Sequence, residues 1–405
     1  MARRMLEGVR VLDLTQYLAG PTITRLMAEL GADVIKVEVA PGGDASRHLP
    51  MVKDGRSTYY VQQNRGKRSI CVDFKHPDGV ALIKRLAAKV DVVTENFGPG
   101  VLEKRGLDYA SLKEVNPSLV MASVSAYGKT GPWSHKTGYD MLGQAASGMM
   151  HVTGEPDGPP LFTGSPIADV SAGVHAFAAV GYALFHRAQT GEGAHIDVAL
   201  AECLVHMHSI AIQSYSYTHG EQTQERTGRY AGQAGPAGTF KGPSGWLIVI
   251  AMERQWERLV ELMGRPELLT DPRFADSSKR GEHREALNVI IEEWLAGFPD
   301  NEAALACLDD ARIPAGPVLA PQDLFTHPQA VARQWVREVH DRALGSFAIP
   351  GAPFKFSNPA GQPPDDLQAP FLGEHNAEVL LDVLGCDQAE IDRLASAGVI
   401  QAARI

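Results

Sequence analysis

The chain has 405 residues, of which 44% are hydrophobic and 21% are charged, and its formal net charge is −10. This length allows one large domain and a smaller one, each with its own core. The excess of acidic residues argues against a nucleic-acid-binding protein, although a local basic pocket can still hold an anionic ligand. We therefore expect a small-molecule partner.

The cysteines and the N-terminal segment indicate a compartment. The four cysteines are too far apart for a CxxC metal site, and nothing marks a disulfide framework. The first residues, MARRMLEGVRVLDL, lack the apolar run of a signal peptide, and no window reaches the uninterrupted apolar length of a membrane span. We expect a cytoplasmic protein that binds neither nucleic acid nor membrane.

The first half of the chain alternates short β-branched runs with amphipathic helices. The pattern predicts a strand at Val9–Leu14, a helix at Pro21–Leu30 and a strand at Ala32–Glu38, which together form one βαβ unit. The same order returns with a strand at Ser69–Phe74, a helix at Gly79–Lys89, and strands at Asp91–Asn96 and Leu119–Tyr127. This alternation predicts an open parallel sheet.

The character of the sequence changes after residue 217. Residues Thr218–Gly245 are polar and glycine-rich, as in a linker or a mobile loop. A strand at Trp246–Ala251 and acidic helical segments then predict a smaller α+β domain, and a last helix is expected at Asn376–Gly385. We assign 1–217 and 331–405 to a large domain, and 218–330 to the linker and the small domain.

Common cofactor motifs do not occur in the chain. The loop after the first strand reads TQYLAGP, which lacks both the GxGxxG and the GxxxxGK[ST] patterns of dinucleotide and nucleotide sites. The sequence also has no GxSxG elbow and no HExxH pair. We therefore expect no metal and no nucleotide redox cofactor, and a dehydrogenase is disfavoured.

Asp169 is an unusual residue for its surroundings. It lies in FTGSPIADVSAG, among small and apolar residues, where a loop leads into the apolar segment Val174–Phe185. One interpretation is a helix N-cap, since aspartate is a preferred capping residue. The other is a carboxylate nucleophile that the N–H groups of Val170 and Ser171 keep ionised. The local sequence leaves both interpretations open.

Several segments together carry a family resemblance. They are GVRVLDLTQYLAGP, LGADVIKVE, NRGKRSICVDFK, ENFGPGVLEKRGLD, the Asp169 segment, TGEGAHIDVAL, IPAGPV, GAPFKFS and LGEH. With them the chain resembles the class III CoA-transferase family along nearly its whole length. The resemblance implies an α/β fold with an open Rossmann-like parallel sheet in a large discontinuous domain, a smaller α+β domain, and an interlocked homodimer.

The resemblance also implies a chemistry. Asp169 matches the family's catalytic carboxylate, which attacks an acyl-CoA thioester to form a mixed anhydride and then an aspartyl-CoA thioester. The substrates it implies are coenzyme A, as acyl-CoA, and a small carboxylic acid.

Further site residues follow from the same resemblance. For the acyl pocket it implies Tyr59, Tyr139 and Asp140, and for a lid the loop 232–238 with Gly235 and Gly238. Leu18 stands where the oxalate-specific branch of the family has a glutamine, and the neighbouring Gln16 is the candidate to substitute for that amide. For the CoA moiety it implies Asn96, Phe97 and Lys104, with Arg105 as the alternative to Lys104, and Arg47 or Lys36 as a further source of positive charge.

Two other functions stay open at this point. The racemase branch of the family has a histidine before the aspartate of a GHD motif, where this chain has Tyr139 before Asp140. A tyrosine, with an ordinary pKa near 10, is a weak base for an α-proton at neutral pH, so CoA transfer is favoured. A protein that binds CoA without catalysis is the second alternative, and affinity without exchange of labelled CoA would identify it.

Overall fold

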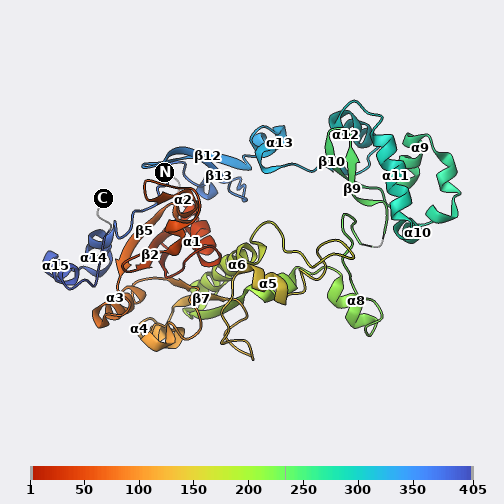
Figure 1. The fold of residues 1–405 in the computed structure, drawn as a ribbon. Coiled ribbons are helices and arrows are strands. Elements are labelled where there is room, and N and C mark those ends of the chain that lie inside the picture. Colours follow the sequence, from red (N-terminus) through yellow and green to blue (C-terminus); the bar gives the residue numbers. More distant parts are fainter. Residues whose placement is uncertain (1–2, 233, 403–405) are drawn as a thin grey trace. The chain divides into compact units, whose positions relative to one another are not determined.

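The computed structural model describes residues 3–232 and 234–402, which form two compact units (Figure 1). The first unit comprises the described residues of Met1–Gly148, Thr163–Met207 and Ala332–Ile405, and the second comprises those of Met149–Phe162 and His208–Val331. The chain therefore enters the first unit three times. The sequence places the corresponding boundaries after residues 217 and 330.

The first unit is built on a six-stranded sheet in which every neighbouring pair is parallel, as the alternating sequence pattern predicts. The strand order is β5-β2-β1-β6-β7-β8. The strands are β1 (Arg10–Asp13), β2 (Asp33–Val39), β5 (Lys67–Val72), β6 (Val92–Glu95), β7 (Val120–Ser125) and β8 (Ala194–Ala199). The chain builds outward from β1 in one direction and then returns to add β6 on its other side. The carboxyl ends of β1 and β6 thus form a topological switch point, where open α/β sheets bind ligands.

Helices and two hairpins complete the first unit. The helices are α1 (Ala19–Glu29), α2 (Thr58–Asn64), α3 (Pro77–Ala87), α4 (Tyr109–Val115), α5 (Asp140–Ala146), α6 (Ile167–Thr190), α7 (Leu200–His206), α14 (Asn376–Leu384) and α15 (Gln388–Ser396). The hairpins pair β3 (Val52–Lys53) with β4 (Arg56–Ser57), and β12 (Val336–Asp341) with β13 (Gly345–Pro350). Helix α13 (Pro328–Ala332) belongs to the second unit except for its last residue. The expectation that the chain closes with the helix at Asn376–Gly385 is wrong, because α15 follows it. Its apolar residues Ile391 and Leu394 join the same buried core as α14.

Helices α1 and α6 pack closely against each other near the switch point (Figure 1). At Gly173 of α6, a Cβ atom would lie 2.6 Å from Cβ of Thr22 and 2.7 Å from the carbonyl oxygen of Ala19. Only glycine permits so close an approach of the two helices. This contact lies one turn of α6 beyond Asp169, so it also fixes where that carboxylate lies.

The second unit is a smaller α+β structure. Its sheet has the antiparallel order β11-β10-β9, with β9 (Ala237–Gly242), β10 (Gly245–Ile250) and β11 (Ala315–Pro317). Its helices are α8 (Ala211–Tyr217), α9 (Glu253–Met263), α10 (Ser277–Glu282), α11 (Arg284–Leu295) and α12 (Asn301–Asp310). The segment predicted as a linker, Thr218–Gly245, contains β9. Its Phe240 is buried in the core of this unit, so the linker prediction is wrong for those residues.

The sequence predicts no segment that is long and apolar enough to span a membrane, and helix α6 contradicts this prediction. Its 24 residues meet that description by length and composition alone. The core helix of a soluble protein passes the same test. In α6, 28% of the apolar window is buried, on the face where Ala172, Gly173 and Ala176 pack against α1, whereas such a core helix is mostly buried.

Candidate active site

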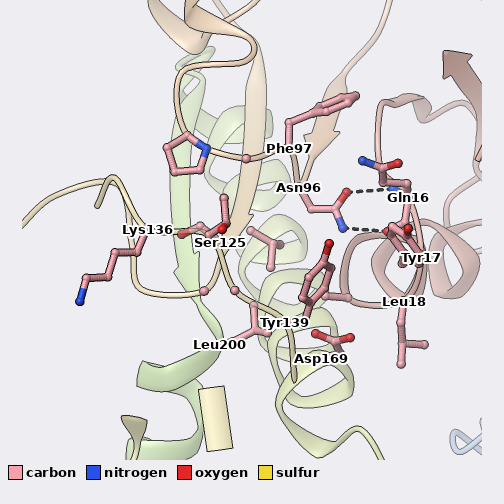
Figure 2. Close-up of a pocket in the computed structure, with 17 residues that line it drawn as sticks. Gln16, Tyr17, Leu18, Asn96, Phe97, Ser125, Lys136, Tyr139, Asp169 and Leu200 are labelled. Atoms are coloured by element: carbon pink, nitrogen blue, oxygen red, sulfur yellow. Dashed lines mark hydrogen bonds between the residues drawn. The ribbon is translucent and has the colours of Figure 1, made fainter. Parts of the chain in front are cut away.

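A pocket of about 160 Å³ lies at the switch point between β1 and β6 (Figure 2). It is lined by Gln16, Tyr17, Leu18, Ala19, Asn96, Phe97, Gly98, Pro99, Val124, Ser125, Ala126, Lys136, Thr137, Gly138, Tyr139, Asp169 and Leu200. Six residues predicted from the sequence therefore lie together: Gln16, Leu18, Asn96, Phe97, Tyr139 and Asp169. Among the residues that line this pocket, Asp169 supplies the one carboxylate.

Side chains from β2 and from the end of β6 hold the loop after β1 in place. Oδ1 of Asn96 accepts from the backbone N–H of Gln16, and Nδ2 of Asn96 donates to the Gln16 carbonyl, both at 2.8 Å (Figure 2). Nζ of the buried Lys36 donates to the carbonyl of Thr15. Tyr17 then adopts a left-handed backbone (φ 66°), which is unusual for an aromatic residue. The amide of Asn96, predicted to contact CoA, is thus engaged in shaping this loop.

Asp169 lies in the first turn of α6, and it is not the N-cap. The cap position is Pro166, which has no side-chain oxygen to offer. Instead, Oδ1 of Asp140, at the start of α5, accepts from the backbone N–H groups of Ala168 (2.7 Å) and Asp169 (3.2 Å). Asp140 therefore caps α6 across space, which leaves the Asp169 carboxylate free of that task.

The electrostatic surroundings of Asp169 oppose its ionisation. Burial, and then the neighbouring charge of Asp140, raise the pKa of Asp169 to about 7. The expectation that the N–H groups of Val170 and Ser171 keep it ionised disagrees with this raised pKa, and the N–H of Val170 donates to the carbonyl of Pro166 instead. A carboxylate with a pKa near neutrality, on the wall of a pocket, has the character of a catalytic group.

Tyrosines surround this carboxylate. The rings of Tyr17 and Tyr139 meet edge to face with centroids 6.3 Å apart, and Figure 2 shows Tyr139 next to Asp169. Tyr59 of α2 is also close enough for the charge of Asp169 to act on it: burial and that charge raise the pKa of Tyr59 to about 12. The Tyr59 phenol thus keeps its proton at neutral pH and can donate it in a hydrogen bond.

The predicted CoA-binding cations are mostly occupied elsewhere. Lys36 is fully buried and pairs with Asp44 at 2.8 Å, so its ammonium is not open to a phosphate. Arg47 forms a two-bond pair with Glu38, and Arg105 donates to the carbonyls of Phe74 and Val101. Lys104 is exposed, but it does not line the pocket. The prediction that these residues bind CoA loses support for Lys36, Arg47 and Arg105.

Sequence reasoning missed other pocket residues, notably Tyr17, Ser125 and Lys136. In Figure 2 the Lys136 side chain extends away from Tyr139 and Asp169, and its Nζ lies 4.3 Å from the ring centroid of Trp133. The dipeptide Lys136-Thr137 directly precedes Gly138-Tyr139-Asp140, the segment at the place of the GHD motif, so proximity in sequence was the available signal.

The predicted lid residues, Gly235 and Gly238, belong to the second unit. Gly238 lies in β9, opposite Val249 of β10. The N–H of Gly235 donates to the carbonyl of Ser277, and the carbonyl of Gly235 accepts from Nε of Arg280. Gln233, inside the predicted lid, lies outside the described residues. The lid over Asp169 stays a prediction.

A pocket at the switch point of a parallel sheet, with one carboxylate of raised pKa, defines an α/β protein that acts on a small ligand. The family model of CoA-transferase family III matches residues 6–376. The formyl-CoA:oxalate CoA-transferase of Streptomyces coelicolor is 36% identical, over 99% of this chain and 100% of that protein. The succinyl-CoA:glutarate CoA-transferase of Mus musculus is 35% identical, over 98% and 90%. A crystal structure of a CAIB/BAIF family protein from Brucella suis superimposes with a TM-score of 0.81 at 36% identity, over 96% of this chain and 100% of that one.

The chain therefore belongs to CoA-transferase family III, and it is an enzyme of the CoA-transferase type. This confirms the resemblance that the sequence motifs indicate. It also explains the missing dinucleotide fingerprint, since the substrates of this family are CoA thioesters.

Proposed function

We propose that this enzyme moves CoA from an acyl-CoA thioester to a free carboxylic acid, with the Asp169 carboxylate as the covalent nucleophile. The observation that carries the proposal is the position of Asp169. Its carboxylate lies on the wall of the switch-point pocket, and Asp140 relieves it of helix capping. Its raised pKa supports the same role, because a carboxylate that is poorly stabilised as an anion is the more reactive nucleophile.

The chemistry balances without a proton or a water molecule. Asp169 attacks the thioester carbonyl, the C–S bond breaks, and a mixed anhydride and CoA thiolate form. The thiolate then attacks the aspartyl carbonyl of the anhydride, releasing the donor acid and leaving an aspartyl-CoA thioester. The acceptor carboxylate attacks this thioester, and the returning thiolate takes the acceptor's acyl group and frees Asp169. A step that consumes no proton needs no general base.

The surrounding phenols fit this role better than a racemase role. Each tetrahedral intermediate carries an oxyanion, which Tyr59 can stabilise as a hydrogen-bond donor. A racemase needs a base that removes an α-proton. A phenol with a pKa of about 12, such as Tyr59, is a poor base at neutral pH, and no histidine lines the pocket among the described residues.

The relatives suggest the class of acid. The names of two of them specify oxalate and glutarate as CoA acceptors, and a third, at 36% identity, is a succinyl-CoA--D-citramalate CoA-transferase. We propose a small carboxylic acid as the acceptor here. Leu18 stands where the oxalate-specific branch has a glutamine. Leucine cannot make the amide hydrogen bond to a small dicarboxylate, so we do not propose oxalate as the acceptor.

The test of the mechanism is a trapping experiment. The purified enzyme is incubated with formyl-, acetyl- or succinyl-CoA, quenched with hydroxylamine, and digested for mass spectrometry. We expect an aspartyl hydroxamate at Asp169, because hydroxylamine displaces CoA from the aspartyl thioester. Asp169→Ala should give no adduct and no transfer while it keeps the native circular dichroism spectrum. Near-native turnover by that variant would contradict the proposal.

We also propose that the enzyme is a homodimer whose chains interlock, as the resemblance implies. The support in the structure is the outer face of α6, where Val174, Tyr182 and Phe185 recur at helical spacing and are 43%, 78% and 63% exposed. A row of large exposed apolar side chains on one helix is typical of a surface that another chain covers.

A further inference from the structure

The first turn of α6 depends on a buried amide that does not line the pocket. Gln144 of α5 is completely buried. Its Nε2 donates to Oδ2 of Asp140 at 2.6 Å, and its Oε1 accepts from the backbone N–H of Thr163 at 3.0 Å. The same amide thus holds both the capping carboxylate and the chain that leads into α6.

These bonds form a continuous connection to the nucleophile. Oδ2 of Asp140 is held by Gln144, and Oδ1 of Asp140 holds the N–H groups of Ala168 and Asp169. Thr163 lies four residues before the start of α6 at Ile167. Gly143, next to Gln144, fits tightly as well, because a Cβ there would lie 3.1 Å from that of Ala168 and 3.0 Å from that of Leu200. Helix α5 therefore has little freedom to shift against α6.

We propose that Gln144 is a positioning residue for the proposed nucleophile: its amide orients Asp140 and the Thr163 backbone so that the first turn of α6 presents the Asp169 carboxylate in one place. Glutamine suits this role because one planar group offers a donor and an acceptor. A buried polar group that loses either partner carries a desolvation cost, so the arrangement is enforced in both directions. This inference rests on the proposed function of Asp169.

The charge distribution around Asp169 makes the role measurable. The titratable groups that face it are Asp140 from α5, Tyr59 from α2, and Tyr17 and Tyr139 from the pocket wall, while Lys136 lines the same pocket and extends away. The Gln144 amide donates to Asp140, whose charge is one of the two causes of the raised pKa of Asp169. Changing residue 144 must therefore alter both the place of Asp169 and the pH at which it ionises.

The experiment combines two single variants with a swapped pair. Gln144→Leu keeps the volume and removes both bonds. We expect its kcat to fall about tenfold to hundredfold while KM for acyl-CoA stays within about threefold, because the change displaces the nucleophile and leaves the pocket wall intact. Gln144→Glu places a carboxylate against Asp140. We expect it to lower kcat as well and to move the acid limb of the pH–rate profile to higher pH, since a third negative charge disfavours ionisation of Asp169.

The swapped pair Asp140→Asn with Gln144→Glu restores every bond, with donor and acceptor exchanged. The amide at 140 donates to the carboxylate at 144, its oxygen still accepts from α6, and the other oxygen at 144 accepts from Thr163. We expect kcat about tenfold above that of Gln144→Glu alone. The acid limb of its pH–rate profile should lie at lower pH than that of the wild type, because the negative charge is one side chain farther from Asp169. A residue that only stabilises the fold would restore the melting temperature without moving this limb.

Asn376→Leu is the matched control. Its buried amide also bridges two backbone groups, the N–H of Cys71 on the edge strand β5 and the carbonyl of Gln401, two strands away from β1. It should lower the melting temperature and leave kcat and the acid limb unchanged. The proposal is overturned if Gln144→Leu retains kcat within about twofold of the wild type, or if the swapped pair is folded but no more active than Gln144→Glu. Activity that survives in Asp169→Ala would instead remove the proposed function.

Discussion

The ionised carboxylate of Asp169 lowers the free energy of unfolding of the chain. This single residue therefore makes the stability depend on pH. Its pKa is raised from 3.8 to about 7, chiefly by burial. Between these pH values the folded chain holds a proton that the unfolded chain has lost, so the contribution of this group to stability decreases as the pH rises from about 4 to 7.

Asp169→Asn removes that charge and keeps the shape. We therefore expect the variant to be more stable than the wild type by roughly 2 kcal/mol at about pH 8, a value discounted for the partial exposure of the side chain. Urea denaturation at a series of pH values measures this difference, which should shrink toward zero near about pH 4. A variant that is less stable than the wild type at pH 8 would show that Asp169 makes stabilising contacts as an anion.

At the scale of the element, the close approach of α1 and α6 determines where Asp169 lies. A methyl group at Gly173 would be 2.6 Å from Cβ of Thr22 and 2.7 Å from a carbonyl oxygen of α1. We expect Gly173→Ala to destabilise the chain by about 1 to 3 kcal/mol, since the helices must separate. Its kcat should fall as well, because the first turn of α6 moves with the helix. Thermal unfolding and steady-state kinetics on the same preparation measure both effects.

The same helix offers a control. Gly181 lies on α6 where an added Cβ meets nothing within 4 Å. Gly181→Ala should therefore leave the first turn of α6, and with it kcat, unchanged in the assembled enzyme. Because Gly181 shares the exposed face of Val174 and Phe185, native mass spectrometry of the variant checks that assembly is intact. Equal effects of the two substitutions would contradict the role of the α1–α6 contact.

Which elements the sequence predicts, and which it does not, follows from burial. The strands β1, β2, β5, β6 and β7 have buried apolar runs, which the pattern reveals. The edge strand β8, AHIDVA, is half exposed and carries His195 and Asp197, so its sequence does not mark it as a strand. The short strand β9 lies in a glycine-rich segment whose composition predicts a linker. Local patterns therefore identify strands with buried apolar runs, including the edge strand β5, better than strands that are half exposed or glycine-rich.

At the scale of the whole molecule, the sequence likewise predicts some residues of the candidate site and misses others. Asp169, Tyr139 and Leu18 come from motifs that the family resemblance carries, and they do line one pocket. The capping of α6 by Asp140, and the link through Gln144 to Thr163, join segments that are about twenty to thirty residues apart. No spacing rule relates these segments, because the geometry arises only when α5 packs on α6. The same holds for Lys36, whose buried ammonium is held by Asp44 and by the carbonyl of Thr15, from the loops after β2 and β1.

The proposed interlocked dimer predicts an unusual exchange behaviour for the whole molecule. Two chains that merely touch through the outer face of α6 would separate and recombine on dilution, whereas interlocked chains can exchange only when at least one unfolds. We expect two isotopically distinct preparations, mixed under native conditions, to show no hybrid dimers by native mass spectrometry. Hybrids should appear after unfolding in urea and refolding together. Tyr182→Lys with Phe185→Lys, on the exposed face of α6, is expected to weaken assembly, since it places charges in the interface. Rapid formation of hybrids without denaturant would rule out interlocking, and a stable folded monomer at sub-micromolar concentration would rule out the obligate dimer itself.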